Sequence, residues 1–195
     1  MKITYNNYIY ESLEIQKILY HGSKNKFNKF DYNYAYTDNS NASLGPGFYL
    51  SPDITKSLGY AYPSGFIYEI ELNNTKNIKS IKSKYNLKLF DALMDNIPDK
   101  EIVFSNWSDD FKKGKNLLRN DLLKNRTLYQ LVRSFWAEAY RYSEPELLKL
   151  LVSLGVDGFL IYTGYQNDYE IVLYNPDIAK FVKTQTYSEA KLDSK

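Results

Sequence analysis

Short segments near both ends of the chain have hydrophobic patterns that predict strands. Residues 17–21 form an apolar run that Gly22-Ser23 closes, which is typical of a strand ending in a turn. In Phe66–Leu72 apolar residues occupy every second position and two glutamates lie between them, which predicts a half-buried strand. Three more short strands are expected at residues Phe48–Leu50, 158–163 and 170–174.

Helical patterns fill most of the chain between these strands. Residues 51–53 (Ser-Pro-Asp) offer an N-cap serine, a proline at the first helical position and an acid in the first turn, so a helix should run to about Ala61. Residues 73 to about 150 are polar and helical in pattern, and 127–142 predict one amphipathic helix. The next helix opens at 143–146 (Ser-Glu-Pro-Glu), which matches a capping box, and should stop at Gly155.

The order of elements is strands, then helices, then strands again, without a regular alternation. This order favours an α+β fold with largely antiparallel sheets over a parallel α/β fold. We expect one domain over residues 1–184, a helical insertion at about 73–150 and a disordered tail at 185–195. Residues 24–43 are polar and are expected to be mostly loop.

Composition narrows the chemistry more than it narrows the fold. The 195 residues carry a net charge of +2, a single histidine and no cysteine, which excludes disulfides, thiolate metal sites and cysteine nucleophiles. No apolar stretch approaches the roughly 20 residues that span a bilayer, and residues 1–14 do not resemble a signal peptide. We therefore expect a soluble, cytoplasmic protein without a membrane partner.

Five residues carry the candidate chemistry, and none is decisive by itself. The only histidine, His21, stands at the end of the first strand. Tyr49 lies on the second predicted strand, and Tyr60 follows eleven residues later on the next helix. Ser57 precedes Tyr60 by three residues, so both should face the same side of that helix. Glu170 begins a late apolar strand, where a carboxylate is mildly unexpected.

This order and spacing resemble the ADP-ribosyltransferases of the His-Tyr-Glu class, which includes diphtheria toxin and the poly(ADP-ribose) polymerases. Residues 56–60 (Lys-Ser-Leu-Gly-Tyr) look like the polymerase pattern Lys-Ser-x-x-Tyr, which follows a glycine-rich strand carrying tyrosine. The similarity covers residues 17–72 and 147–175, whereas 73–146 match no feature of that class. It implies two packed, mainly antiparallel sheets with NAD+ bound in the cleft between them.

The resemblance assigns binding roles to five residues. The rings of Tyr49 and Tyr60 would sandwich the cationic nicotinamide, with a cation–π attraction of about 2 kcal/mol when desolvated. The backbone of Gly22 and the hydroxyl of Ser57 would hold its carboxamide. His21 would hydrogen-bond the adenosine ribose. NAD+ is then a substrate, and no metal is expected.

Glu170 would be the catalytic residue. Cleavage of the nicotinamide–ribose bond develops an oxocarbenium ion, which a nearby carboxylate stabilises. Asp168 stands at an offset that helps to choose the acceptor in another branch of the family, but here we interpret it as a loop residue. A tyrosine at 32, 34 or 36 is a candidate for stacking on adenine.

The acceptor of ADP-ribose stays open at this level. Basic clusters at 76–84 and 112–126 suit either a nucleic-acid target or solvated helix faces, and the second interpretation is favoured. Transfer of a single ADP-ribose to a protein or nucleic acid, as by a bacterial, phage or viral effector or toxin, fits the resemblance, with delivery into a host cytoplasm included. An NAD+ hydrolase and a non-catalytic NAD+ or ADP-ribose-binding module are the alternatives. A tRNA 2′-phosphotransferase is set aside, because it needs further histidine and arginine residues.

Overall fold

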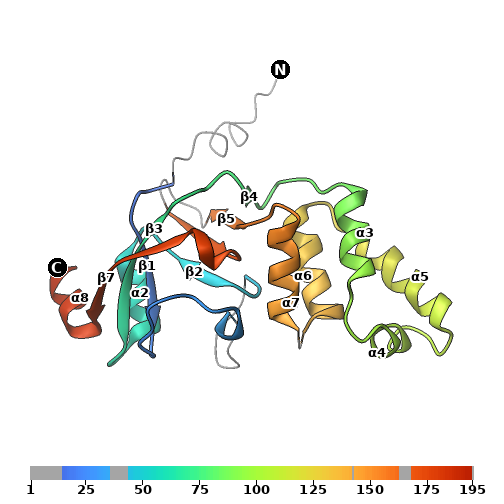
Figure 1. Cartoon of the computed structure of the whole chain (residues 1–195), viewed down its shortest axis with the longest axis horizontal. Coiled ribbons are helices and arrows are strands. Elements are labelled where there is room, and N and C mark those ends of the chain that lie inside the picture. The colour runs from blue at the N-terminus through green and yellow to red at the C-terminus, as the bar shows by residue number, and fades with distance from the viewer. Residues whose placement is uncertain (1–14, 36–43, 142, 163–167, 195) are drawn as a thin grey trace, which may run out of the picture.

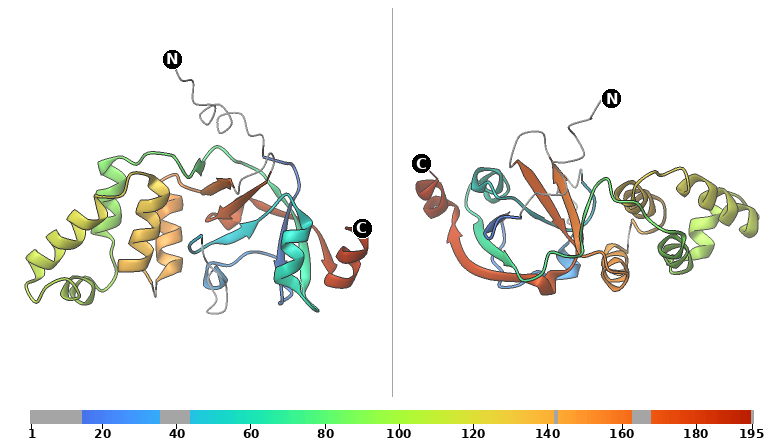
Figure 2. Two further views of the ribbon diagram at one scale, coloured as in Figure 1. Left: turned by 180° about the vertical axis from the view of Figure 1, so that it is seen from behind. Right: turned by 90° about the horizontal axis from the view of Figure 1, so that it is seen from above.

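The computed structural model describes residues 15–35, 44–141, 143–162 and 168–194 and has an α+β architecture (Figure 1). The sheets occupy one end of the molecule and the helices between β4 and β5 the other, as the views in Figure 2 also show. The strands are β1 (Leu19–Ser23), β2 (Phe48–Leu50), β3 (Phe66–Leu72), β4 (Ile78–Ser80), β5 (Gly158–Tyr162), β6 (Tyr169–Leu173) and β7 (Ala179–Thr186). The helices are α2 (Ile54–Ala61), α3 (Leu87–Asp95), α4 (Lys100–Ser105), α5 (Phe111–Leu122), α6 (Leu128–Ala139), α7 (Glu144–Ser153) and α8 (Tyr187–Asp193), with short 3₁₀ turns η1 (Tyr32–Tyr34) and η2 (Pro176–Ile178).

The strands form two sheets. One has the order β1-β3-β7 and is antiparallel throughout, and the other has the order β2-β6-β5-β4. In the second sheet only the β4–β5 pair is parallel. An isolated bridge joins the sheets, because the amide and carbonyl of Tyr20 in β1 exchange hydrogen bonds of 2.7 and 3.0 Å with Ser51 after β2. The expected α+β fold with two mainly antiparallel sheets is therefore confirmed.

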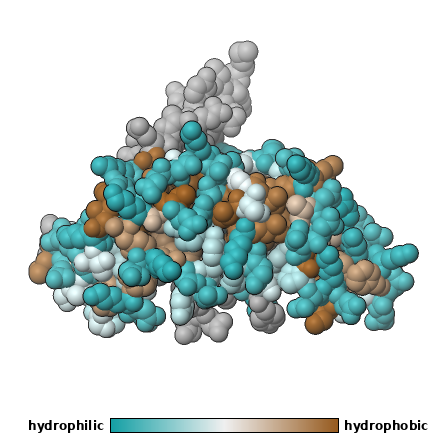
Figure 3. Space-filling model, viewed as in Figure 1, coloured by the Kyte–Doolittle hydropathy of each residue, from teal (hydrophilic) through white to brown (hydrophobic). Residues whose placement is uncertain are grey.

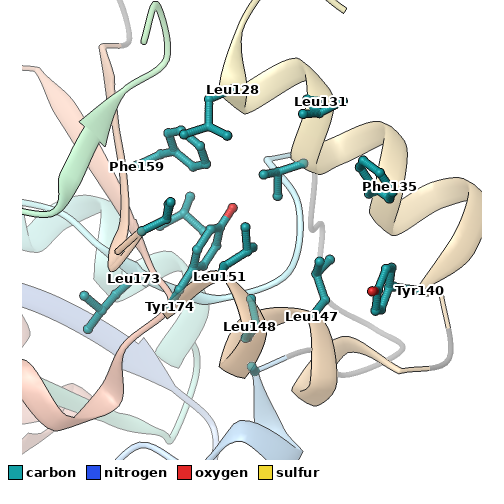
Figure 4. Packing of buried hydrophobic residues seen from close by; sticks show 14 of the residues in the cluster. Leu128, Leu131, Phe135, Tyr140, Leu147, Leu148, Leu151, Phe159, Leu173 and Tyr174 are labelled. Atoms are coloured by element: carbon teal, nitrogen blue, oxygen red, sulfur yellow. The ribbon is translucent and has the colours of Figure 1, made fainter. Parts of the chain in front are cut away.

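The helical region shares its core with the second sheet (Figure 4). Leu128, Leu131 and Phe135 of α6 face leucines of α7, and all of these side chains are buried. Phe159 of β5 and Tyr174, which follows β6, pack into the same cluster. Burial of this apolar stripe on α6 explains why its amphipathic pattern was readable in the sequence. Most of the face in Figure 3 is hydrophilic, with hydrophobic residues showing between the helices and sheets.

Two helix starts differ from the sequence prediction. Asp53, not Ser51, caps α2, because its carboxylate accepts a hydrogen bond from the Thr55 amide at 2.8 Å. The backbone of Ser51 is still extended, since it forms the bridge to β1. At α7, Ser143 occupies the N-cap but makes no side-chain cap hydrogen bond, so the expected capping box is absent.

The C-terminal segment also differs from expectation. Instead of a disordered tail at 185–195, β7 continues to Thr186 and α8 follows at once, with a capping box between Thr186 and Glu189. Ala190 of α8 is fully buried against Ala61 of α2 and Ile67 of β3, which holds the helix on the first sheet. The first strand continues through Gly22 and Ser23, where a turn was expected.

Residues 36–43 and most of the expected 164–168 loop lie outside the described residues, and so does Lys195. No helix in the described part of the chain is long and apolar enough to cross a bilayer.

Candidate functional site

Four of the predicted site side chains line one narrow cleft. Tyr49 comes from β2, Ser57 and Tyr60 from α2, and Glu170 from β6. Because β2 and β6 are antiparallel neighbours and Tyr49 lies opposite Val172, Tyr49 and Glu170 project from the same face of the sheet. The helix that carries Ser57 and Tyr60 follows β2 after three residues, so the local chain path delivers it to this face.

The cleft is nearly closed. Its volume is about 10 Å³, which leaves room for roughly one water molecule. Of its lining residues, Ser57 is buried at 3% exposure, whereas Tyr60 is 47% exposed. An exposed side chain changes rotamer in picoseconds to nanoseconds, so outward rotation of Tyr60 would widen the cleft.

Gly22 of β1 sets the distance between this strand and α2. A Cβ atom at Gly22 would lie 1.9 Å from the carbonyl oxygen of Ser57 and 3.2 Å from the Cβ of Tyr60. Only hydrogen fits there, so the glycine lets α2 approach closely enough to carry its two side chains into the cleft.

Replacement of Gly22 by alanine should therefore displace α2 and destabilise the fold. We expect a loss of about 1–3 kcal/mol in the free energy of unfolding, typical of overpacking against backbone. Gly59→Ala in the same helix is the matched control, because a Cβ there meets nothing within 4 Å. The control should gain about 0.5–1 kcal/mol from helix propensity. Urea unfolding measures the stability of both variants. Equal free energies of unfolding would show that α2 can move away from β1 without loss of stability.

His21 does not line the cleft but contacts the backbone of Tyr49, which does. Its Nδ1 is 2.9 Å from the carbonyl oxygen of Tyr49. The imidazole packs against the rings of Phe27, Phe30 and Tyr68, with centroids 5.8, 5.1 and 6.1 Å away, and the residue stays partly exposed. This packing desolvates the imidazole, which lowers the pKa of His21 to about 4.

These contacts define the tautomer of His21. A carbonyl oxygen only accepts hydrogen bonds, so Nδ1 carries the proton and donates it to Tyr49. At neutral pH the ring is uncharged, and Nε2 is left as a hydrogen-bond acceptor.

The two tyrosines of the cleft are held in their neutral form. The hydroxyl of Tyr49 donates to the carbonyl of Gly45 at 2.5 Å, and burial raises the pKa of Tyr49. Burial, and then the negative charge of Glu170, raise the pKa of Tyr60. The charge of Glu170 acts in the same direction on Tyr49, so one carboxylate lies close to both phenols.

An ion pair between Lys56 and Asp168 crosses beside the cleft. It links the helix carrying Tyr60 to the residue just before β6, which carries Glu170. Their side chains are 28% and 31% exposed, so the pair is partly shielded from solvent. Our interpretation of Asp168 as a mere loop residue missed this contact. No local pattern signals this contact, because Lys56 and Asp168 lie 112 residues apart.

Tyr32 and Tyr34, two of the candidates for stacking on adenine, do not line the cleft. The ring of Tyr32 is contacted by Lys149 of α7, 5.5 Å from its centroid, and Tyr34 is 73% exposed. Position 36 lies outside the described residues. In the described ranges no group of three or more His, Asp or Glu side chains is arranged to hold a metal ion.

The cleft thus combines two neutral aromatic rings, two serine hydroxyls and one carboxylate, with Lys56 at its lining as well. Such a set can hold a flat cation between rings and stabilise positive charge beside it. Comparison of the chain with protein-family models, curated proteins and solved structures gives no match.

Proposed function

We propose that this protein is an ADP-ribosyltransferase that cleaves the nicotinamide–ribose bond of NAD+ and transfers ADP-ribose to a macromolecular acceptor. The observation that carries the proposal is the meeting of Tyr49, Tyr60 and Glu170 in one cleft. These residues stand on three elements and up to 121 positions apart. The high tyrosine content of the chain does not by itself explain why two tyrosines and a carboxylate meet in one cleft.

In this mechanism the cleft first binds the nicotinamide end of NAD+. The cationic ring stacks between Tyr49 and Tyr60, and its carboxamide is held by the Ser57 hydroxyl and the adjoining backbone of Gly22. The Nε2 atom of His21 accepts a hydrogen bond from a ribose hydroxyl, a role that its neutral tautomer allows.

Bond breaking then uses the charge of Glu170. The bond between ribose C1′ and the nicotinamide nitrogen breaks, and its electron pair stays on nicotinamide, which leaves neutral. The positive charge moves to the ribose as an oxocarbenium ion, and the Glu170 carboxylate stabilises it. An acceptor nucleophile bonds to C1′ and loses its proton, which completes the transfer.

The direct test is nicotinamide release from NAD+ labelled on its adenine side, followed by chromatography of the small molecules and by nuclease or protease digestion of the labelled material. Release with label in protein or nucleic acid supports a transferase. Release without such label supports the NAD+ hydrolase. Binding of NAD+ without release supports a non-catalytic module and contradicts the proposal.

The stacking role of Tyr60 predicts a loss of NAD+ affinity in Tyr60→Ala. Removal of a cation–π partner worth about 2 kcal/mol should raise the Kd by roughly 30-fold. Tyr60→Phe keeps the ring and should stay within a few-fold of wild type. Tyr62→Ala is the control, because Tyr62 is 62% exposed and its ring contacts Tyr187 rather than the cleft. Isothermal titration measures all three, and equal affinity for Tyr60→Ala and wild type would exclude stacking on this ring.

A further inference from the structure

Positive charge is concentrated in the helical region. Residues 73–150 contain 15 Lys and Arg against 10 Asp and Glu, whereas the rest of the chain contains 10 against 13. Most of this excess lies in the two basic clusters, which are about 30 residues apart in the sequence. Whether they act together depends on where the fold places them.

The fold joins parts of both clusters at the start of α6. The Nζ atom of Lys84 donates to the carbonyl oxygen of Arg126 at 3.1 Å. The amide of Leu128 donates to the carbonyl of Ser83 at 2.8 Å, so the segment after β4 runs against the start of the helix. We call the exposed side chains brought together here the basic patch: Lys82, Lys84, Lys124 and Arg126.

A groove of about 340 Å³ follows α6, and its lining includes Asn125, which stands between Lys124 and Arg126 of the patch. Tyr129 and Trp136 contribute aromatic rings to its lining, and Arg133 lies between them with its guanidinium 5.8 Å from the Tyr129 ring. The indole N–H of Trp136 donates to the carboxylate of Glu144 at 3.1 Å, which fixes the orientation of that ring. The two rings are seven residues, or about 10 Å, apart along the helix.

We propose that the basic patch and this groove bind single-stranded nucleic acid. Lys84, Arg126 and Arg133 would contact phosphates, and bases would stack on Tyr129 and Trp136. This combination of charge with two aligned rings favours nucleic acid over an acidic protein surface, which needs the charges but has no flat bases to stack. Binding here requires no NAD+ chemistry and goes beyond the proposed transferase activity.

The groove also lies next to the candidate cleft. The hydroxyl of Tyr129 donates to the carbonyl of Leu44 at 3.3 Å, and Gly45 is packed near Arg133. The carbonyl of Gly45 accepts the hydroxyl of Tyr49. A single-stranded nucleic acid bound in the groove therefore passes close to the cleft. That this nucleic acid also accepts ADP-ribose rests on the proposed function.

Fluorescence anisotropy with fluorescein-labelled 12-nucleotide oligo(U) and oligo(dT), measured without NAD+, tests the binding. Wild type should bind at 50 mM salt, and log K should fall with log salt by about 0.7 per phosphate contacted. Lys84→Gln/Arg126→Gln/Arg133→Gln should weaken binding at least tenfold. The matched control is Lys112→Gln/Lys113→Gln/Lys115→Gln. It removes the same charge from the N-terminal end of α5, whereas the patch follows the C-terminal end, and it should change the affinity less than twofold.

Stacking has its own readout, because the chain has only two tryptophans. In Trp107→Phe the remaining Trp136 should lose fluorescence when the oligonucleotide binds. No binding by wild type, equal loss in both triple variants, or unchanged Trp136 emission would overturn the proposal. If polyglutamate displaces the labelled oligonucleotide as strongly as unlabelled oligonucleotide does, the surface binds anions or acidic proteins in general, which would also overturn the proposal. Since NAD+ is absent, a failure of nicotinamide release leaves these results unaffected.

Discussion

Replacement of Glu170 by glutamine is expected to lower the rate of nicotinamide release about 10²–10³-fold. Glutamine preserves the shape of the side chain but removes the negative charge that stabilises the oxocarbenium ion. Glu170 lies on β6 between β2 and β5 and is only partly buried, so the substitution should leave the sheet intact. The loss should therefore appear in the chemical step rather than in folding.

Steady-state nicotinamide release by chromatography, with circular dichroism to verify the fold, measures this effect. Glu69→Gln is the matched control, because Glu69 is also a partly exposed strand carboxylate but lies on β3, outside the cleft. The control should retain the wild-type rate within a few-fold. A folded Glu170→Gln protein with wild-type activity would refute the catalytic role.

Acidification should destabilise the protein through His21. Burial lowers its pKa from the ordinary value of 6.5, which applies to the unfolded chain, to about 4 in the folded state. Between these values the unfolded chain binds a proton that the folded chain rejects, so the free energy of unfolding falls as pH falls. The loss should reach about 2 kcal/mol by pH 5 and about 3 kcal/mol by pH 4, and it should be absent above pH 7.

Urea unfolding of wild type and His21→Asn at several pH values between 7 and 4 isolates this contribution. Asparagine can still donate to the carbonyl of Tyr49 but does not titrate. Carboxylates destabilise both proteins alike, so the difference between the two curves reports the histidine. Parallel curves over this range would mean that His21 takes up a proton in the folded state.

Local sequence patterns determined much of the fold and several parts of the candidate site. The alternation in Phe66–Leu72 and the apolar stripe of α6 identified these elements, because periodicity depends only on neighbouring residues. The tyrosines at 49 and 60 and the late carboxylate at 170 were selected because their order and spacing resemble the His-Tyr-Glu transferases. That spacing carried no information on the size of the cleft, which depends on how closely β1 and α2 pack.

Long-range contacts decided the rest. Ser51 pairs with Tyr20 as extended backbone, so α2 is capped by Asp53 and not by Ser51 as its local sequence suggested. Residues 187–193 form a helix because Ala190 is buried, although their polar composition suggested disorder.

The same holds for charge and ionisation. Desolvation among the rings of Phe27, Phe30 and Tyr68 lowers the pKa of His21, and no sequence pattern encodes that packing. Lys56 and Asp168 pair across 112 residues, and Lys84 meets Arg126 across 42. The sequence by itself determined which side chains are present and which local elements carry them. Only the tertiary structure decided which of them meet, because burial, desolvation and ion pairing depend on distances in space that separation along the chain does not define.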